Sequence, residues 1–450
     1  MTTLLVWEPA LTPSQGSRLS RFRANLLPTP APTHNSAPTP NPAPISPAHV
    51  AQWVQVGNDI DGENPGDWSG HSTALSSNGA VVAIGAPLNN GAGSDAGHVR
   101  VYFNAGGGWE QRGSDLDGSA AGYQFGFAVS LSADGNILAV GANRADGVNG
   151  GNSGRVYVFQ WISNTWQPLG SMLDGAGALD EFGNSVALSD SGTILAVGAW
   201  GNDAGGSNAG HVRVFAWTGT DWTQRGNNLL GSSPGDQFGN SVSLSSDGSI
   251  VACGGDQPFN DGPGYVTIYR WSGSAWQRQG STLMGFSPND RVGQSVSLSG
   301  DGSIVAVGTD LRNSGFGNYV VVYQYDGTDW VQIGQTIRGD DGFGFSLSLS
   351  FDGKTILIGG YRNDSNMMHS GHALVFRLSP NEQELMQQVG QEPNEQEWMQ
   401  VGQELVGEAA DDRFGHSTSI SDDGTRIAIG AIGNDGNGGG AGHVRVYDLQ

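Results

Sequence analysis

Carboxylate side chains recur at one position of a repeated pattern, where they could attract cations. Six aspartates occupy that position, and Tyr123 takes it in one further unit: Asp67, Asp180, Asp236, Asp290, Asp341 and Asp412. Arranged around a ring, these acids could line a cationic funnel. Alternatively, each accepts hydrogen bonds within its own unit, from arginines such as Arg100, Arg213 and Arg445. We expect the second arrangement, because the unit with Tyr123 lacks both the aspartate and the arginine.

Loops rich in Asn, Asp and Gly offer further oxygen atoms. Asp203 and Asp435 are weak candidates for calcium ligands, although Asn-Asp-Gly sequences more often form turns. Five other aspartates stand in Ser-x-Asp-Gly turns: Asp134, Asp247, Asp301, Asp352 and Asp423. One carboxylate on a tight turn cannot supply the roughly six to eight oxygens that Ca²⁺ takes. We therefore expect these five to be turn residues, and no cofactor beyond weakly bound Ca²⁺.

Histidine and cysteine do not suggest a catalytic centre. Four histidines share one repeat position but lie in different units, so a shared metal site is not expected: His98, His211, His372 and His443. Cys253 is the single cysteine and ends an apolar run, where it should act as a small buried hydrophobe. No Ser/His/Asp series, metal cluster or carboxylate pair departs from the repeat, so the chain is not expected to be an enzyme.

A few residues break the repeat with side chains that often anchor interfaces. Exposed aromatic residues and arginines are typical of such anchors. We expect the ligand-binding residues among Trp200, Arg144, Phe259, Arg312, Phe316 and Arg362. Trp200 is the first choice, because Asn143 and Ile432 take its place in other units.

The composition limits the classes of partner. The chain has 450 residues, 73 glycines and a net charge of −23. An acidic surface repels phosphates, so nucleic acid is not an expected partner. No apolar run reaches the roughly 18 residues of a membrane-spanning helix, so membrane insertion is not expected. A monomer is the expected oligomeric state.

The elements that position these residues come from a sevenfold repeat. Tryptophan marks each unit, at Trp53, Trp109, Trp166, Trp222, Trp276, Trp330 and Trp398. Each unit contains four short strand patterns, which we letter A to D, with tight turns between A and B and between C and D. A fixed period of this length is typical of a radial repeat. The sequence therefore predicts an all-β fold, a seven-bladed β-propeller with four-stranded antiparallel blades.

The order of strands predicts how the ring closes. The chain ends after its seventh C strand, and its first repeat element is an unattached D strand, so we expect Trp53–Ile60 to pair with Val444–Tyr447. Residues 378–397 contain a duplicated insertion before the last D strand, and Trp398–Gln403 is favoured over Leu385–Gln391 for that strand. Outside the propeller at 53–450, residues 1–27 are expected to be a leader or an unstructured remnant, and 28–48 a Pro/Thr/Ala-rich linker or stalk.

Two dipeptide signals resemble those of a known family. Phe-Gly stands at Phe125, Phe182, Phe238, Phe343 and Phe414, and a full Gly-Ala-Pro stands at Gly85. These signals resemble the FG-GAP repeat, the unit of the integrin α-subunit N-terminal propeller, over about residues 53–447. The resemblance implies ligand binding or adhesion in an extracellular or cell-surface protein. The family's calcium loop, D-x-D-x-D-G, is replaced here by Ser-x-Asp-Gly, so its calcium sites do not carry over.

The sequence thus favours a non-catalytic scaffold that binds a protein or a glycan. Because strands alternate in direction, the long B–C and D–A loops share one face, and loops on a rigid scaffold usually carry binding residues. The alternatives are a structural module of a larger protein and a propeller hydrolase or lyase.

Overall fold

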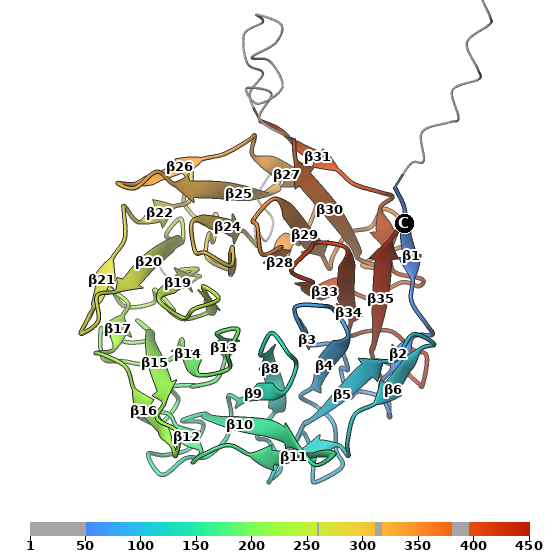
Figure 1. Cartoon of the computed structure of the whole chain (residues 1–450), viewed down its shortest axis with the longest axis horizontal. Helices are drawn as coiled ribbons and strands as arrows, with labels where there is room; N and C mark the ends of the chain where they lie inside the picture. Colours follow the sequence, from blue (N-terminus) through green and yellow to red (C-terminus); the bar gives the residue numbers. More distant parts are fainter. Residues whose placement is uncertain (1–50, 259–260, 311–316, 380–395) are drawn as a thin grey trace, which may run out of the picture. The chain divides into compact units, whose positions relative to one another are not determined.

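Alternation of apolar and small polar residues makes each repeat a half-buried antiparallel sheet. The computed structural model describes residues 51–258, 261–310, 317–379 and 396–450. All regular elements in these ranges are β-strands, and they form seven sheets arranged as blades around a central axis (Figure 1). The predicted all-β, seven-bladed propeller is confirmed. The expectations for residues 1–27 and 28–48 lie outside the described residues.

Strands A and B form the inner half of each blade. The A strands lie closest to the centre in Figure 1, and they are β3 (Ser72–Leu75), β8 (Phe125–Leu131), β13 (Ser185–Leu188), β18 (Ser241–Leu244), β23 (Ser295–Leu298), β28 (Phe343–Leu349) and β33 (Phe414–Ile420). The B strands are β4 (Val81–Ala86), β9 (Ile137–Ala142), β14 (Ile194–Ala199), β19 (Ile250–Gly255), β24 (Ile304–Gly308), β29 (Thr355–Gly360) and β34 (Arg426–Ala431). The B strands are almost wholly buried, as their continuous apolar runs predict.

Strands C and D form the outer half. The C strands are β5 (His98–Asn104), β10 (Arg155–Ile162), β15 (His211–Trp217), β20 (Tyr265–Trp271), β25 (Asn318–Tyr325), β30 (His372–Leu378) and β35 (His443–Leu449). Each D strand is split into two short pieces that pair with the same C strand, a division that the sequence pattern did not predict. The first pieces are β1 (Trp53–Gln55), β6 (Trp109–Gln111), β11 (Thr165–Pro168), β16 (Trp222–Gln224), β21 (Trp276–Arg278), β26 (Trp330–Gln332) and β31 (Trp398–Gln400). The second pieces are β2 (Ile60–Asp61), β7 (Leu116–Asp117), β12 (Leu173–Asp174), β17 (Leu229–Leu230), β22 (Leu283–Met284), β27 (Ile337–Gly339) and β32 (Leu405–Val406).

The ring closes where the sequence predicts. Blades 1 to 6 begin with β3, β8, β13, β18, β23 and β28, and blade 7 combines β33–β35 with β1 and β2. Trp53 pairs with Leu449, and Ile60 pairs with Val444, so the two ends of the repeat region share one sheet (Figure 1). In blade 6, β31 at Trp398–Gln400 supplies the D strand, as favoured, whereas Leu385–Gln391 lies outside the described residues.

Tryptophans tie each blade to the one before it. Every repeat tryptophan donates its indole N–H to the backbone carbonyl of the residue that follows the first piece of strand D in the preceding blade, over 2.7 to 3.1 Å. Three of them also pair across the C–D hairpin with a second tryptophan, as predicted: Trp161 with Trp166, Trp217 with Trp222, and Trp271 with Trp276. The outer edge of the ring is therefore held by a belt of hydrogen bonds between blades.

The inner edge depends on glycine. A Cβ atom at Gly198, near the end of β14, would lie 1.9 Å from the carbonyl oxygen of Gly239 in the next blade. Gly239 itself has φ +91°, which residues with a side chain rarely adopt. The same close approach recurs between every pair of neighbouring blades (Gly85, Gly141, Gly254, Gly308, Gly359 and Gly430 are the counterparts of Gly198). The Gly-Ala and Phe-Gly signals are thus the two sides of one contact between blades.

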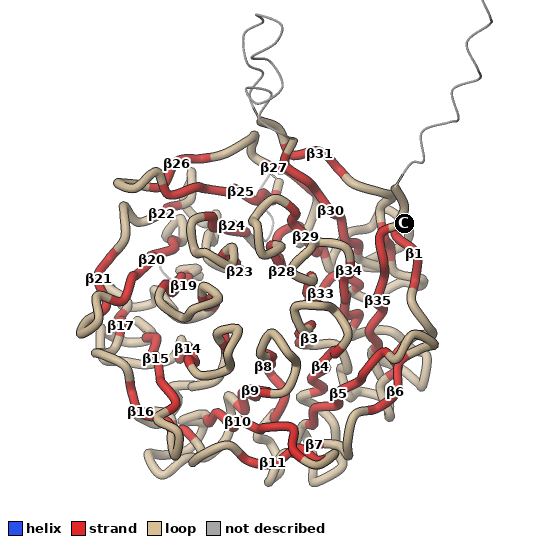
Figure 2. Tube along the Cα trace, viewed as in Figure 1, coloured by secondary structure: helices blue, strands red, loops and turns tan. Residues whose placement is uncertain are grey.

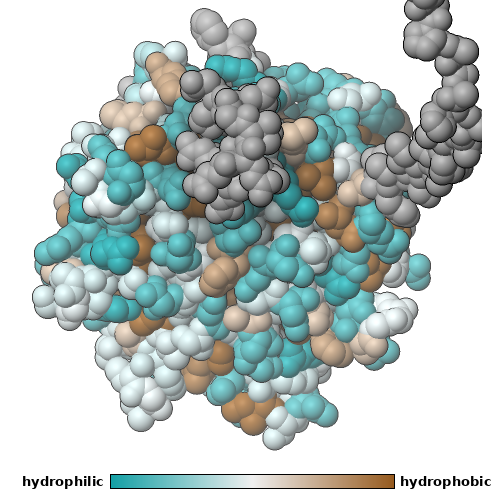
Figure 3. Space-filling model, turned by 45° about the horizontal axis from the view of Figure 1, so that its top comes forward, coloured by the Kyte–Doolittle hydropathy of each residue, from teal (hydrophilic) through white to brown (hydrophobic). Residues whose placement is uncertain are grey.

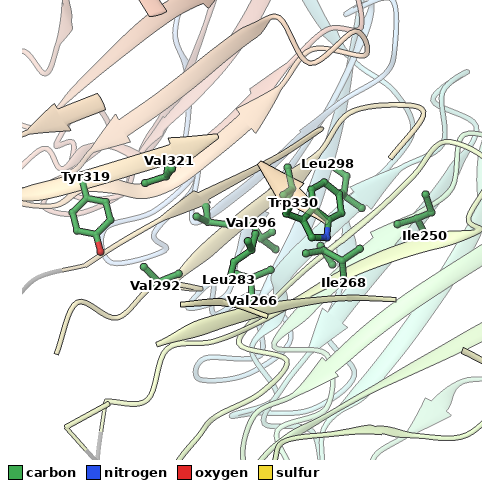
Figure 4. Packing of buried hydrophobic residues seen from close by; sticks show 13 residues of the cluster. Ile250, Val266, Ile268, Leu283, Val292, Val296, Leu298, Tyr319, Val321 and Trp330 are labelled. Carbon is green, nitrogen blue, oxygen red and sulfur yellow. The ribbon is translucent and has the colours of Figure 1, made fainter. Parts of the chain in front are cut away.

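Hydrophobic cores fill the spaces between the blades. One core joins Ile268 of blade 4 to Val296 and Trp330 of blade 5 (Figure 4). Seven such clusters span the seven junctions. On the surface seen in Figure 3, brown hydrophobic residues are interspersed with teal hydrophilic ones. The blades are therefore joined by a buried apolar core at each of the seven junctions.

Candidate ligand-binding face

The B–C and D–A loops lie on one side of the propeller, which we call the loop face. In blade 3, eleven residues separate β14 from β15 (200–210), whereas five residues (189–193) join β13 to β14. On the opposite side, the A–B turns keep their repeated chemistry. Ser132 Oγ donates to Asp134 over 2.7 Å, and the same bond recurs at Asp247, Asp301, Asp352 and Asp423. These five aspartates are turn residues, as expected (Figure 2 shows the turns in tan).

Two of the predicted site residues meet at an acidic side chain that the sequence analysis missed. Trp200 follows β14 and is half-buried, and the exposed Arg144 follows β9 of the neighbouring blade. Between them lies Glu181, which accepts hydrogen bonds from Trp200 and, over 3.3 Å, from Asn143. Burial raises the pKa of the Glu181 carboxyl, although Arg144 and these donors oppose the rise. The arrangement brings an indole, a guanidinium and a carboxylate into one region of the loop face.

The backbone at Glu181 is unusual. Its φ is +51°, in the left-handed region that favours glycine. The residue before each Phe-Gly position has a positive φ in all seven blades, and six of these residues carry a side chain: Trp68, Gln124, Glu181, Gln237, Arg291 and Arg413. Strained backbone of this kind is often found at ligand sites. Glu181 is the one acid at this position in the seven repeats, so a comparison of this position between the repeats could have found it.

Arg362 lies in a separate, acidic part of the loop face. Its guanidinium carbon is 4.9 Å from the centre of the Tyr361 ring. A cavity of about 410 Å³ beside it is also lined by Asp340, Asp341 and Asp364. The structure therefore does not place Arg362 with Trp200. Phe259, Arg312 and Phe316, the other predicted binding residues, lie outside the described residues.

The two weak calcium candidates close their own loops. Asp203 accepts the backbone N–H of Asn208 over 2.8 Å, and Asp435 accepts that of Gly440 over 2.8 Å. Both side chains are exposed. In the described part of the chain, neither belongs to a group of three metal-ligating side chains; the two groups found there are Asp59, Asp61 and His443, and Glu63, His98 and Asp115.

The repeated aspartates mostly act within their own loops, but their partners differ from the expected ones. Asp180 accepts the backbone N–H groups of Ala176 and Gly177 and the side-chain amide of Asn202. Asp236 and Asp290 also accept a tyrosine hydroxyl. The expected arginine bonds are wrong, because Arg100 and Arg213 donate to the carbonyls of Asp61 and Asp174, and Arg445 to the Asp59 carboxylate. Asp341 is exposed, and its neighbour Asp340 faces Asn363 instead.

A second group on the loop face was also missed by the sequence analysis. The residue after each Phe-Gly position lies near the start of strand A, and in four adjacent blades it is a phenylalanine or a histidine. With Tyr361, these residues form what we call the aromatic arc: Phe127, His71, His416, Phe345 and Tyr361. Successive ring centres are 4.4 to 5.1 Å apart.

The other three blades place amides at the same position. Asn184, Asn240 and Gln294 are half-buried, and the Asn184 amide donates to the Asn240 carbonyl over 3.1 Å. The inner ring of the loop face is thus divided into an aromatic part and an amide part. Sequence periodicity hid this division, because each residue is unremarkable within its own repeat.

The aromatic arc should make the propeller sensitive to acid. Burial lowers the pKa of His71 to about 4, and burial next to His71 holds the pKa of His416 well below its usual value. Both histidines then stay neutral in the fold but gain protons near pH 6.5 when unfolded. Stability should be complete above pH 6.5 and fall between pH 6.5 and 4, by up to about 1.4 kcal/mol per pH unit for each histidine. Urea unfolding at several pH values measures this slope.

A matched variant is available for this test. Phenylalanine occupies the same position in blades 2 and 6, so His71→Phe with His416→Phe should flatten the slope and keep the packing. The groups that face the pair are Trp68, Phe127, Phe345, Tyr361 and the charged Arg413. His369→Gln, on an exposed loop, is the control that should leave the slope unchanged. An unaltered slope in the double variant would contradict the prediction.

Comparison with known proteins agrees with the geometry. A family model described as "FG-GAP repeat" matches residues 115–159, 173–215 and 407–447. These segments cover strands A to C of blades 2, 3 and 7. No curated protein matches the chain. Among the described residues, no helix could span a lipid bilayer. The chain is therefore a seven-bladed β-propeller that contains FG-GAP repeats.

Proposed function

We propose that this propeller is a non-catalytic scaffold that binds a protein or a glycan on its loop face, in extracellular adhesion or recognition. The supporting observation is that the residues of the loop face differ between the repeats, whereas those of the opposite face are repeated. The A–B turns of the opposite face repeat their serine–aspartate bond in five blades. On the loop face, the aromatic arc and the Trp200–Glu181 group differ from their counterparts in other blades.

The side chains of this face suit a mixed ligand. Trp200 and the aromatic arc offer apolar ring surface, which stacks on sugars or packs against protein side chains. Arg144 and Glu181 add opposite charges next to the indole, which would fix the orientation of a polar ligand. FG-GAP repeats also occur in extracellular proteins, which supports the proposed location outside the cell.

Array binding with substituted chains tests the proposal. The labelled full chain is applied to glycan and protein arrays, and each ligand found is retested with Trp200→Ala. Loss of a central aromatic anchor should weaken binding by about 2 kcal/mol or more, roughly thirtyfold. Arg144→Ala should weaken it less, because its side chain is exposed.

Two substitutions on the opposite side serve as controls. Ile162 is an apolar residue, 43% exposed at the C–D turn of blade 2, and is the control for Trp200. Lys354 is a cationic residue, exposed at the A–B turn of blade 6, and is the control for Arg144. Ile162→Ala and Lys354→Ala should leave binding unchanged. Equal losses from the controls and from Trp200→Ala would place the ligand elsewhere.

A further inference from the structure

The histidine that opens strand C meets an acid from strand D of the same blade. In blade 6, His372 Nδ1 lies 2.6 Å from Glu404. In blade 7, His443 Nδ1 is 3.4 Å from Asp59, and in blade 1, His98 lies beside Asp115. The sequence analysis excluded only a metal shared between blades. It did not consider that a histidine, the strand D acid of its own blade and an acid from the adjoining D–A loop could form a ligand set.

Blades 3 and 6 do not offer such a set. Blade 3 has Asn228 in place of the strand D acid beside His211. In blade 6, the short hydrogen bond to Glu404 already satisfies His372 Nδ1. Each of these histidines therefore lacks a pair of carboxylates.

Blade 7 has the carboxylates but also a competing cation. The Arg445 guanidinium donates two hydrogen bonds to Asp59, over 3.0 and 2.7 Å. A metal ion at Asp59 and His443 would have to displace the positively charged guanidinium of Arg445 or lie close to it. Bidentate bonds of this kind are among the strongest that a carboxylate forms.

Blade 1 differs from the other three because two carboxylates lie beside its histidine and no guanidinium is hydrogen-bonded to either. His98 is 1% exposed, and its Nε2 atom is buried with no hydrogen-bond partner in the described structure, as is Nε2 of His211, His372 and His443. Its Nδ1 atom faces Glu63, with 3.7 Å to Oε2, which is too long for a hydrogen bond. Asp115 completes the group, with one ligand atom from each of the three residues inside 4.8 Å. Neither nitrogen of His98 forms a hydrogen bond in the described structure, so Nδ1, which faces the carboxylates, is available to a cation.

The carboxylates of this group remain available. Asp115 accepts one bond, from the neutral amide of Gln111 over 2.6 Å. Arg100 comes no closer than 3.8 Å to Glu63 and donates to the Asp61 carbonyl instead. Glu63 and Asp115 together carry two negative charges near His98, and Arg100 beside Glu63 supplies one positive charge.

We propose that Glu63, His98 and Asp115 bind a divalent transition-metal cation of the Zn²⁺ class. One imidazole nitrogen with two carboxylate oxygens is a ligand set that Zn²⁺ accepts, with a fourth position left for water. Ca²⁺ prefers oxygen ligands only and more of them. The site is distinct from the calcium candidates at Asp203 and Asp435.

The position of Glu63 gives this cation a structural role. Glu63 follows β2, the second piece of the strand that closes the ring, whereas His98 and Asp115 belong to blade 1. The bound ion would tie the segment after the closing strand to the next blade. It should therefore stabilise the junction where the two ends of the ring meet.

Calorimetric titration of the full chain, after chelator treatment and dialysis, tests the proposal with ZnCl₂ and CaCl₂. His98 is buried and its replacement could unfold the protein, so the variants are Glu63→Gln and Asp115→Asn. Each should weaken the Zn²⁺ site by at least about tenfold, the loss typical of altering a metal site. CaCl₂ should not compete. Thermal unfolding should shift upward with Zn²⁺ in the unsubstituted chain and not in the double variant.

Glu404→Gln is the matched control, because it alters the acid beside the equivalent histidine in blade 6. It should bind Zn²⁺ as the unsubstituted chain does. The proposal is overturned if Zn²⁺ gives no binding heat, or if the isotherm is the same in the Glu63→Gln and Asp115→Asn variants. In the second case, Zn²⁺ binds other histidines of the chain.

Discussion

Trp53→Ala should lower the free energy of unfolding by about 3–5 kcal/mol, the usual cost of truncating a buried aromatic residue. Trp53 is 3% exposed and packs with Val375, Leu405 and Tyr447 in the core between blades 6 and 7. Its indole N–H donates to the Val401 carbonyl over 2.9 Å. Unlike the other six repeat tryptophans, it lies on the strand that joins the two ends of the ring. Urea denaturation followed by tryptophan fluorescence and circular dichroism measures the change.

The adjacent residue provides the control. Val54 lies on the same strand, is 40% exposed and pairs with Asp448. Val54→Ala should change stability by less than about 0.5 kcal/mol, as surface substitutions usually do. If Trp53→Ala proved as mild as Val54→Ala, β1 would not hold the ring closed, and another junction would set its stability.

The sequence predicted those parts of the fold that depend on local pattern. Ser-x-Asp-Gly turns such as that at Asp134 and the tryptophan pairs at Trp161 and Trp217 follow from neighbouring residues in one hairpin. Ring closure by Trp53 followed from counting strands, since the first D strand had no blade of its own and the last blade had no D strand. These features need no knowledge of how two blades approach each other.

The loop face depended on that approach and was only partly predicted. The sequence analysis selected Trp200 and Arg144 because they break the pattern, but their meeting point at Glu181 arises from two blades and a D–A loop. His71 and His416 are more than 340 positions apart in sequence, yet their ring centres lie 4.9 Å apart across the ring closure. Periodicity alone does not indicate which repeats become neighbours on one side of the axis.

The same limit applies to the family signals. In the sequence, Phe-Gly and Gly-Ala indicated only a family resemblance, but in the structure their glycines make the contact between blades. Gly198 lies so close to Gly239 that Ser185 Oγ reaches the same carbonyl, over 2.8 Å. Six of the seven junctions repeat this serine bond, and blade 2 has Ala128 in its place.

Gly198→Ala should therefore be the most damaging small substitution in the strands. The added Cβ would lie 1.9 Å from the Gly239 carbonyl oxygen and 2.4 Å from Ser185 Oγ. Backbone on both sides cannot move away without separating blades 3 and 4, whose cores are close-packed. We expect a loss of more than about 4 kcal/mol or failure to fold. Urea denaturation and size-exclusion chromatography measure the two outcomes.

Gly107→Ala separates crowding from the general effect of replacing glycine. A Cβ at Gly107, in the C–D turn of blade 1, meets no atom within 4 Å. Its replacement should change stability by less than about 1 kcal/mol, because it mainly restricts the unfolded chain. Similar losses at Gly198 and Gly107 would mean that the blades tolerate a wider spacing. A much larger loss of stability at Gly198 than at Gly107, which we expect, would mean that the glycine of the Gly-Ala signal is required for packing seven blades around one axis.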